Sequence, residues 1–494
     1  MDPAKGKWSR IWVGILGSAL TLLLASFAAA QVPLPSVSAD ADPTGSGDRI
    51  AHLERAVLDL QREIELLRSS ACCPQPAAFH GGEGMICDGC DGACPSPAAC
   101  PSHYVTYDDG WAIRPRNPVA SPFELKFNIH NQFRFTEYSN SNDTFVDAAG
   151  NVNPIAPRSD FDINRGRFVF SGYAFDPNIL FYTNIDYSTV AARPVQLLLS
   201  SISYRFSENL IVSMGLGKVP GTWEWQETSR ITLGVERTIA STFFRPSITA
   251  GIWAVGQIGE TLHYQAMVGD GFNTFTLQAA QLDPNLAYST LLWWDPCGDF
   301  GTGFSDLEYH DSLSVRLGHG FTFASNDADP VGEPGPEQTP IRLSDGTRLV
   351  ETGALAPGVT VSAFDISLYA VHLGLKRRGA SLSTEYFFRW LTSIDGSGPL
   401  PVDSLFDHGF FAQGAFFVLP QRLEGYVRGS QVSGDFGTGS EYAVGFNWYC
   451  GGRRGSRFTF DFTRVDDSPT QQDRTGYVAG GSGALYRAQW WHYF

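Results

Sequence analysis

Charged side chains gather in one long segment, residues 218–246, that separates two apolar stretches. Its basic members are Lys218, Arg230, Arg237 and Arg245, and its acidic members are Glu224, Glu227 and Glu236. Four cations against three carboxylates leave a net charge of 4 − 3 = +1. Charges of both signs on one segment can select small ions electrostatically where that segment lines a water-filled passage.

Arginine dominates the basic residues of the chain's larger part. Residues 123–494 contain 23 Arg but only three Lys, at positions 126, 218 and 376. The planar guanidinium matches two phosphate oxygens at once, so an arginine excess is compatible with anion recognition. A genome rich in arginine codons gives the same bias and is the commoner cause. The arginine count alone therefore does not decide between the two.

Catalytic motifs are missing from the sequence. It contains no Gly-x-Ser-x-Gly, no His-Glu-x-x-His and no complete phosphate-binding loop, and its ten His are scattered. We therefore predict a protein that is not an enzyme and needs no cofactor and no metal.

Cysteines cluster in a stretch rich in Pro, Gly and Ala. The six members of this cluster are Cys72, Cys73, Cys87, Cys90, Cys94 and Cys100. The pair Cys87-x-x-Cys90 could begin a zinc site. Disulfides are favoured for an exported chain, and six cysteines allow 15 pairings, within one chain or between chains.

The composition indicates a β-protein with an apolar exterior. Charged residues make up only 17% of the 494 residues, aromatic residues reach 13%, and there are 52 Gly. No apolar run long enough for a spanning helix occurs beyond the N-terminus. The net charge of −16 argues against a nucleic-acid partner, which requires a basic face.

The first 120 residues divide into four parts by pattern. Residues 1–30 have a basic start, an apolar core and small residues at 28–30, as a secretory signal peptide does. Residues 31–48 form a Pro/Ser/Asp-rich linker, residues 49–69 a coiled-coil helix and residues 70–120 a Cys/Pro/Gly-rich linker. An N-terminal membrane anchor is the less favoured alternative to the signal.

Heptad spacing in residues 49–69 predicts an oligomer. The apolar a and d positions are Ile50, Leu53, Val57, Leu60, Ile64 and Leu67. β-Branched residues at a with Leu at d favour a dimer. The arrangement of Arg49 and Glu54 around this seam resembles short trimeric coiled coils, and we favour a homotrimer.

Alternating apolar and polar residues recur through residues 121–494. In 123–135 one face is apolar and the other carries Lys126 and Arg134. The other predicted strands lie near 165–175, 178–188, 196–207, 209–217, 247–258, 260–268, 311–325, 359–377, 379–394, 407–420, 421–434, 438–450, 456–466 and 484–494. A closed bacterial barrel has an even strand number, so we predict an all-β transmembrane antiparallel barrel of about 16 strands.

Several details follow from this barrel assignment. Alternation places Lys126, Arg134, Arg167, Arg389 and Arg487 on the water-facing inner wall. The Asp/Glu-rich stretch 283–351 carries a net charge of 3 − 12 = −9 and is expected to form long outer loops. The terminal Phe494 closes an aromatic strand, which resembles the signal read by the outer-membrane barrel-assembly machinery.

The barrel segment resembles the phosphate-selective porin O and P family over most of its length. The resemblance rests on Arg165-Gly-Arg167 before an aromatic run, on Gly217-Lys218-x-Pro220, on the strand 444–449 and on the closing strand 485–489. Asn164 and Gly166 depart from the family pattern. The resemblance implies a trimeric, roughly 16-stranded, water-filled pore.

Together these patterns predict a porin in the outer membrane of a Gram-negative-type envelope, with its coiled coil in the periplasm. Small hydrophilic solutes would diffuse passively past the segment 218–246 as a constriction loop, and the resemblance implies a preference for anions such as phosphate. The alternative is a trimeric envelope-tethering or adhesive protein that uses the barrel only as an anchor in the membrane lipid.

Overall fold

A computed structural model describes residues 102–190, 194–275, 282–327 and 341–494. The predicted signal peptide, first linker, coiled coil and cysteine cluster lie outside the described residues. Among the described residues, no helix is long and apolar enough to cross a membrane.

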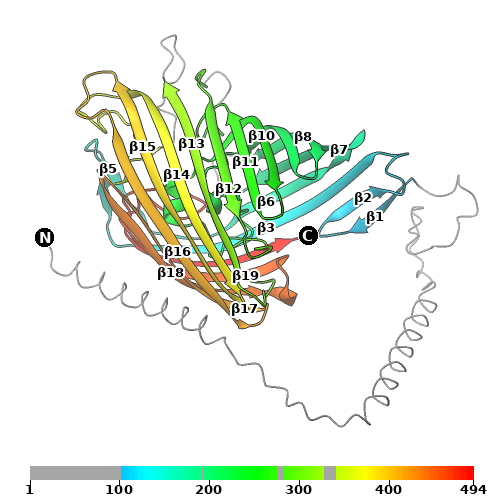
Figure 1. Ribbon diagram of the computed structural model, residues 1–494. Coiled ribbons are helices and arrows are strands. Elements are labelled where there is room, and N and C mark those ends of the chain that lie inside the picture. The colour runs from blue at the N-terminus through cyan, green and yellow to red at the C-terminus, as the bar shows by residue number, and fades with distance from the viewer. Residues whose placement is uncertain (1–101, 191–193, 276–281, 328–340) are drawn as a thin grey trace, which may run out of the picture. The chain divides into compact units, whose positions relative to one another are not determined.

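Strands dominate the fold and close into a barrel (Figure 1). Of the 18 strands in the main sheet, two form an added hairpin, which leaves 18 − 2 = 16 in the closed barrel of the described chain. Each barrel strand pairs antiparallel with the next, and the last pairs with the first. The barrel strands are β3 (Phe123–Asn140), β6 (Arg158–Ala174), β7 (Asp176–Tyr187), β8 (Val195–Ser207), β9 (Leu210–Lys218), β10 (Ile248–Ile258), β11 (Leu262–Gly269), β12 (Ala287–Trp294), β13 (Ser314–Asp327), β14 (Val361–Arg377), β15 (Ala380–Gly396), β16 (Leu405–Leu419), β17 (Leu423–Gly434), β18 (Gly437–Tyr449), β19 (Ser456–Asp466) and β20 (Gly483–Tyr493). The predicted fold class is confirmed.

The strand prediction is wrong at two places. Strand β12 was not predicted, because its short run lies inside the acidic stretch. The hairpin of β1 (His103–Tyr107) and β2 (Trp111–Pro115) lies within residues 70–120, which the sequence assigned to a linker. Its alternation covers only five residues per strand, too few to stand out from a Gly- and Pro-rich background.

Smaller elements decorate the barrel. Strands β4 (Thr144–Val146) and β5 (Val152–Pro154) form a hairpin in the connection between β3 and β6. Helices α3 (Trp223–Gln226) and α4 (Ile239–Phe244) lie between β9 and β10, and the 3-10 turn η3 (Cys450–Gly452) follows β18.

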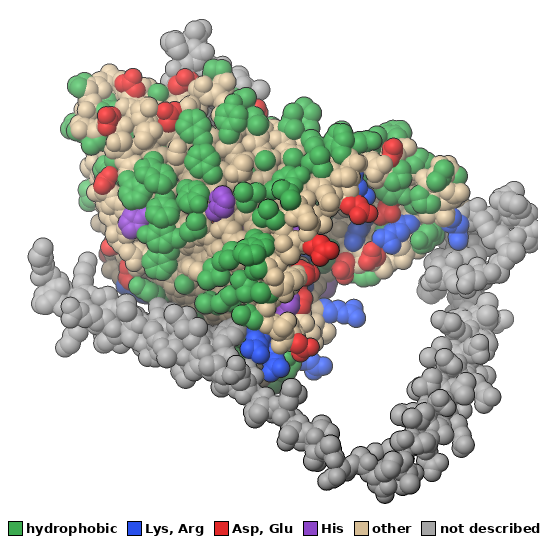
Figure 2. All heavy atoms as spheres, viewed as in Figure 1, with side chains coloured by type: hydrophobic (Ala, Val, Ile, Leu, Met, Phe, Trp, Pro, Cys, Tyr) green, Lys and Arg blue, Asp and Glu red, His purple; other side chains and the backbone are tan. Residues whose placement is uncertain are grey.

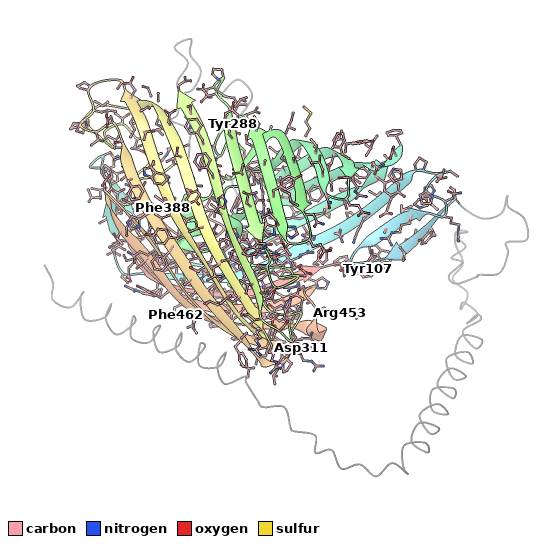
Figure 3. The ribbon with its side chains drawn as sticks, viewed as in Figure 1. Tyr107, Tyr288, Asp311, Phe388, Arg453 and Phe462 are labelled. Carbon is pink, nitrogen blue, oxygen red and sulfur yellow. The ribbon has the colours of Figure 1, made fainter. Side chains whose placement is uncertain are left out.

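The barrel is apolar outside and charged inside. In β15, Glu385, Phe387 and Arg389 are buried, whereas the intervening Phe388 and Trp390 lie on the outer face. Figure 2 shows hydrophobic side chains spread over this outer face, and Figure 3 shows Phe388 on it. A wall that leaves Trp390 39% exposed is stable where hydrocarbon rather than water covers it.

The two ends of the barrel differ. At the turn end, neighbouring strands are joined by short turns such as 208–209 and 378–379. At the loop end the connections are mostly longer. Outward aromatic pairs lie near both ends, Trp390 with Phe406 (5.5 Å between ring centroids) at the loop end and Phe458 with Trp490 (6.4 Å) at the turn end. Aromatic girdles of this kind mark the two interfaces of a membrane barrel.

Connections from both ends of the barrel fold into the lumen. The inner loop, residues 219–247, enters from the loop end, and residues 295–313 enter from the turn end. They meet where Trp223 packs on Phe304 (4.8 Å between ring centroids) and on Phe300. Part of the acidic stretch 283–351 therefore lies inside the barrel instead of forming outer loops, because its apolar anchors Phe300 and Phe304 are buried in the lumen.

Candidate functional site

The inner loop is fixed to the far wall of the barrel by polar side chains of β15 to β19. The backbone N–H groups of Trp223 and Glu224 donate to the two carboxylate oxygens of Glu385, at 2.6 and 3.0 Å. Further along the loop, the N–H of Val235 donates to Asp461 Oδ2 at 3.2 Å. Acceptors on several strands thus satisfy loop N–H groups that would otherwise be buried without partners.

Glu236 ties the inner loop to the opposite side of the barrel. Its carboxylate accepts hydrogen bonds from Arg165 of β6, including one of 2.8 Å from Nη2 to Oε2, and from Arg134 of β3. Burial alone would raise the pKa of Glu236, but the two guanidinium groups hold this pKa well below its usual range. Glu236 is therefore an anion at neutral pH, and the loop is held from both sides.

A second carboxylate organises the loop internally. Glu224 Oε2 accepts from the backbone N–H of Thr238 at 3.1 Å and from its hydroxyl at 2.8 Å. Burial raises the pKa of Glu224 above its ordinary value, and the contact with Thr238 opposes this shift. The two short helices of the loop are joined by this contact, since Thr238 is the N-cap of α4.

Three cations surround the indole ring of Trp225. Lys218 Nζ lies 5.1 Å from the ring centroid, Arg237 Cζ lies 4.9 Å and Arg245 Cζ lies 5.3 Å from it. Cations at these distances are attracted by the negative face of the ring. The Trp225 N–H itself donates to the carbonyl of Ser247, which fixes the ring in place.

These three cations are held by neutral acceptors. Lys218 Nζ donates to the carbonyls of Trp225, Gln226 and Glu227 at 2.9 to 3.0 Å. Arg237 also donates to backbone carbonyls, including that of Glu227 at 2.6 Å. Arg245 faces the side-chain amide of Gln472, whose oxygen, when turned towards it, accepts at 2.6 and 3.0 Å. Within the described residues, none of the three forms an ion pair with a carboxylate.

A cavity of about 240 Å³ opens between this group and the wall formed by β6 to β9. Among the described residues, no carboxylate lines it, and six basic residues do: Arg165, Arg167, Lys218, Arg237, Arg245 and Arg474. Ser229 Oγ and Asn184 Oδ1 also belong to lining residues and have no hydrogen-bond partner within the described part of the chain. We call the cavity lined by these six basic residues the cationic cavity.

The positive charge of the cationic cavity is only partly compensated by carboxylates outside its lining. Asp186 of β7 pairs with both Arg167 and Arg474, and Glu236 pairs with Arg165. Burial and the charge of Arg165 lower the pKa of Arg237 to about 9, and they lower that of Arg245 to about 10. Both arginines are still cations at neutral pH, in surroundings where a bound anion would stabilise them.

The predicted constriction residues all lie in or beside the inner loop inside the barrel. Lys218, Arg237 and Arg245 line the cationic cavity, and Glu224 and Glu236 hold the loop. Glu227 accepts from the Trp223 indole N–H at 3.3 Å, and Arg230 lies over the ring of Tyr493 at 4.1 Å. The seven residues thus divide into cavity-lining cations and loop-holding groups.

The predicted lumen-facing residues lie on the inner side of their strands, but most are neutralised. Arg389 pairs with Asp407 at 2.7 Å and Arg487 with Asp461 at 2.9 Å. Arg134 pairs with Glu236, and Arg167 contacts Asp186 at 3.4 Å. Lys126 lies near the turn end, opposite Ala112 of the hairpin. Only Arg167 among these five lines the cationic cavity.

Three important residues were missing from the predicted site. Arg165 lies on the same face of β6 as Arg167, so period-2 alternation could have found it. Trp225 and Arg474 gave no signal, because their positions depend on how the inner loop and the connection 467–482 fold back into the lumen.

Asp306, Glu308 and His310 bring potential metal ligands within 4.8 Å of one another at the turn end. Their atoms serve internal contacts. Asp306 Oδ2 accepts from the N–H of Gly379 at 2.7 Å, and Glu308 pairs with Arg454 at 2.7 Å. We interpret this group as one that holds residues 295–313 against the neighbouring turns.

Comparison with known proteins gives structural likenesses alone. No protein-family model and no curated protein matches the chain. Solved structures that resemble it include an anion-selective porin from Comamonas acidovorans (TM-score 0.48, 11% identity, 75% of this chain and 99% of that chain). Others are Salmonella typhi OmpF in complex with daunomycin (0.47, 9%, 79% and 100%) and the trimer form of Vibrio cholerae OmpT (0.47, 11%, 75% and 99%). These identities and TM-scores are too low to transfer a solute, a selectivity or an assembly to this chain.

Proposed function

We propose that this protein is a diffusion channel of the outer membrane whose passage prefers small anions. The observation that carries the proposal is the cationic cavity, whose lining within the described part of the chain contains six basic residues and no carboxylate. A channel acts by passive diffusion, so it requires a lumen and a selecting field but no catalytic group.

The selecting field arises from an unequal distribution of charge. Most arginines of the inner wall are neutralised by a carboxylate, as Arg389 is by Asp407. Lys218, Arg237 and Arg245 are exceptions, because their partners are carbonyl and amide oxygens. The charges of Arg237 and Arg245 act on whatever enters the cavity, and a low-dielectric wall strengthens their attraction for anions.

The chemistry of the lining extends the proposal to phosphate, the solute class implied by the resemblance to the phosphate-selective porin family. Guanidinium groups donate pairs of hydrogen bonds to phosphate oxygens, and Ser229 offers a hydroxyl that has no other partner among the described residues. The cavity of about 240 Å³ is large enough for a small oxyanion.

The remainder of the proposal concerns location and assembly. The apolar exterior and its two aromatic girdles fit an outer-membrane barrel inserted by the barrel-assembly machinery, with Phe494 as part of its signal. Residues 49–69, carrying the predicted heptads, would join three copies in the periplasm, and the cysteine cluster 72–100 would support this connection through disulfides.

Single-channel recording in planar bilayers tests the proposal. Purified, refolded full-length protein should produce stepwise conductance in potassium chloride. Addition of phosphate should then lower the chloride current, because phosphate would occupy the cationic cavity. A correctly folded barrel without any conductance would overturn the channel function. Unchanged chloride current would remove phosphate as the solute while leaving the channel in place.

A further inference from the structure

The hairpin β1–β2 lengthens one wall of the barrel beyond its closed part. Strand β20 pairs with β3 as far as Tyr493, which lies opposite His130, and Phe494 exchanges backbone hydrogen bonds with Ile129 (2.8 and 3.1 Å). On the same edge of β3, the next rung is Trp111 of β2 opposite Phe127. The hairpin therefore continues the sheet at the turn end from the point where the last strand stops.

The hairpin is firmly attached to the barrel. The hydroxyl of Tyr493 donates to the carbonyl of Asp109 at 2.8 Å, and the side-chain amide of Asn128 donates to the same carbonyl. Gly110 follows with φ of +144°, where an added Cβ would lie 2.0 Å from Asn128 Nδ2. Because these contacts fix the hairpin turn, the two faces of the hairpin have defined directions relative to the barrel wall.

One face of the hairpin is apolar and is in register with the outer face of the barrel. Paired residues on neighbouring strands point to the same side of a sheet. Two rows thus run from the hairpin into the barrel wall, namely Tyr107–Trp111–Phe127–Phe170 and Val105–Ile113–Leu125–Gly172. Figure 3 shows Tyr107 on the hairpin, and Val105 is 65% and Trp111 53% exposed. This apolar face, formed by Val105, Tyr107, Trp111 and Ile113, is called the hairpin face below.

The opposite face of the hairpin is mostly polar or covered, although Tyr104 on it is 40% exposed. Ala112 is fully buried, and Arg114 pairs with Asp108 at 2.7 Å and approaches Glu124 at 3.6 Å. The hairpin thus has the same inside–outside polarity as the barrel strands, although it stands beyond the closed ring. Its outward side chains would be exposed to water if the membrane boundary coincided with the end of β20.

We propose that the hairpin face lies in the membrane–water interface at the turn end of the barrel, with phospholipid as its partner. This inference depends on the membrane location contained in the proposed function. Tyr and Trp at the end of an apolar wall are the side chains that favour the headgroup level. Arg116, whose guanidinium lies 5.7 Å from the ring of Tyr104, supplies a cation at the same level.

The free edge of the hairpin sets its depth. Among the described residues, β1 pairs with β2 alone, so its other edge presents N–H and C=O groups without a strand partner. Such groups are too costly to place in hydrocarbon but are hydrated at the headgroup level. The free edge of β1 is therefore incompatible with the bilayer core and favours a position in the membrane–water interface.

A second copy of the chain fits the hairpin face less well. Stable protein interfaces use roughly 20–30 residues from each partner. The hairpin face offers four outward side chains, which is few for a protein partner but sufficient for an interfacial anchor. Lipid is also the simpler partner, because the hairpin face continues the apolar outer surface of the barrel that Phe127 and Phe170 form.

Site-specific photo-crosslinking tests the inference in full-length protein reconstituted into phospholipid vesicles. A benzophenone amino acid replaces Val105 on the hairpin face, Thr106 on the opposite face, or Phe388 on the barrel wall. Mass spectrometry then measures phospholipid adducts. We expect adducts at 105 and 388, and roughly tenfold fewer at 106, because neighbouring strand residues point to opposite faces.

The outcomes separate this inference from the proposed function. Adducts at 388 but not at 105 would overturn the hairpin inference and leave the membrane barrel intact. Crosslinks from 105 to a second copy would also overturn it, and absence of adducts at 388 would instead contradict the membrane location. If the 105 variant does not fold, Trp111→Phe replaces it. The fluorescence that the wild type has and the variant lacks then belongs to Trp111. Lipids brominated near the headgroup should quench this fluorescence, and its persistence would reject lipid contact.

Discussion

Arg165 on the barrel wall and Glu236 on the inner loop form a buried two-pronged ion pair, with 2.8 Å between Nη2 and Oε2. The pair joins strand β6 to a loop whose other side is held by β15 to β19. It also separates charge, because Arg165 lines the cationic cavity while the carboxylate lies outside the lining. One contact therefore holds the inner loop to the barrel wall and lowers the positive charge of the cationic cavity.

Glu236→Gln should both loosen the loop and make the passage more cationic. Removal of one partner from a buried ion pair typically costs about 3–5 kcal/mol of stability. We expect noisier single-channel currents and a larger anion-to-cation permeability ratio, since Arg134 and Arg165 lose their carboxylate. Asp466→Asn, at an exposed pair near the loop end, is the control. If the currents of the variant were as quiet as those of the wild type and its permeability ratio were unchanged, Glu236 would not hold the loop.

The same carboxylate predicts a response to acid. Arg165 and Arg134 hold the pKa of Glu236 below its ordinary value of about 4.3. Its stabilising contribution is therefore fully present above that ordinary value and is lost only as the pH falls through the lower, folded-state pKa. Current noise should stay constant from neutral pH to about 4.3 and increase below it. Glu236→Gln should remove this increase, and an increase beginning near neutral pH would assign the transition to another group.

Arg245→Gln is the cleanest test of selectivity. Arg245 lines the cationic cavity and donates to the amide of Gln472, so its charge can be removed with little effect on the loop. We expect the anion-to-cation permeability ratio to fall about threefold, which corresponds to roughly 0.7 kcal/mol of lost attraction. Arg237→Ala should lower the ratio as well, with added noise from its lost backbone contacts. Arg464→Gln, at the exposed loop end, should leave the ratio unchanged, and an equal fall there would contradict a local site.

Glu385→Ala should release the start of the inner loop. The Glu385 carboxyl group accepts from the N–H groups of Trp223 and Glu224, and a buried hydrogen bond typically contributes about 0.5–1.5 kcal/mol. We expect a higher mean conductance, because α3 would leave the wall and widen the passage. Ser383→Ala, on the same strand and face, is the matched control. Identical conductance in both variants would show that Glu385 does not position α3.

The sequence predicts the barrel more completely than the site. Period-2 alternation depends on local side-chain polarity, so it identifies Arg134, Arg389 and Arg487 as inward-facing without any knowledge of the partner strands. Whether such a cation stays free or is neutralised depends on a carboxylate far away in sequence. Arg389 and Asp407 are joined by strand register, and Arg165 and Glu236 by a folded loop.

The inner loop shows this limit most clearly. Its charged residues are visible in the sequence, but their near-balance of +1 conceals how the signs are separated in space. Glu224 and Glu236 form contacts that hold the loop, whereas Lys218, Arg237 and Arg245 surround Trp225 and line the cavity. Arg474 joins them from a connection more than 200 residues later, for which no local pattern exists.

The reversal potential of the wild-type channel in a potassium chloride gradient tests the central claim most directly. If the cationic cavity selects the permeating ions, the zero-current potential will shift towards the chloride equilibrium potential, and Arg245→Gln will reduce the shift. A shift towards the potassium equilibrium potential would contradict the account, because the ions would then follow the acidic outer segments and not the cavity.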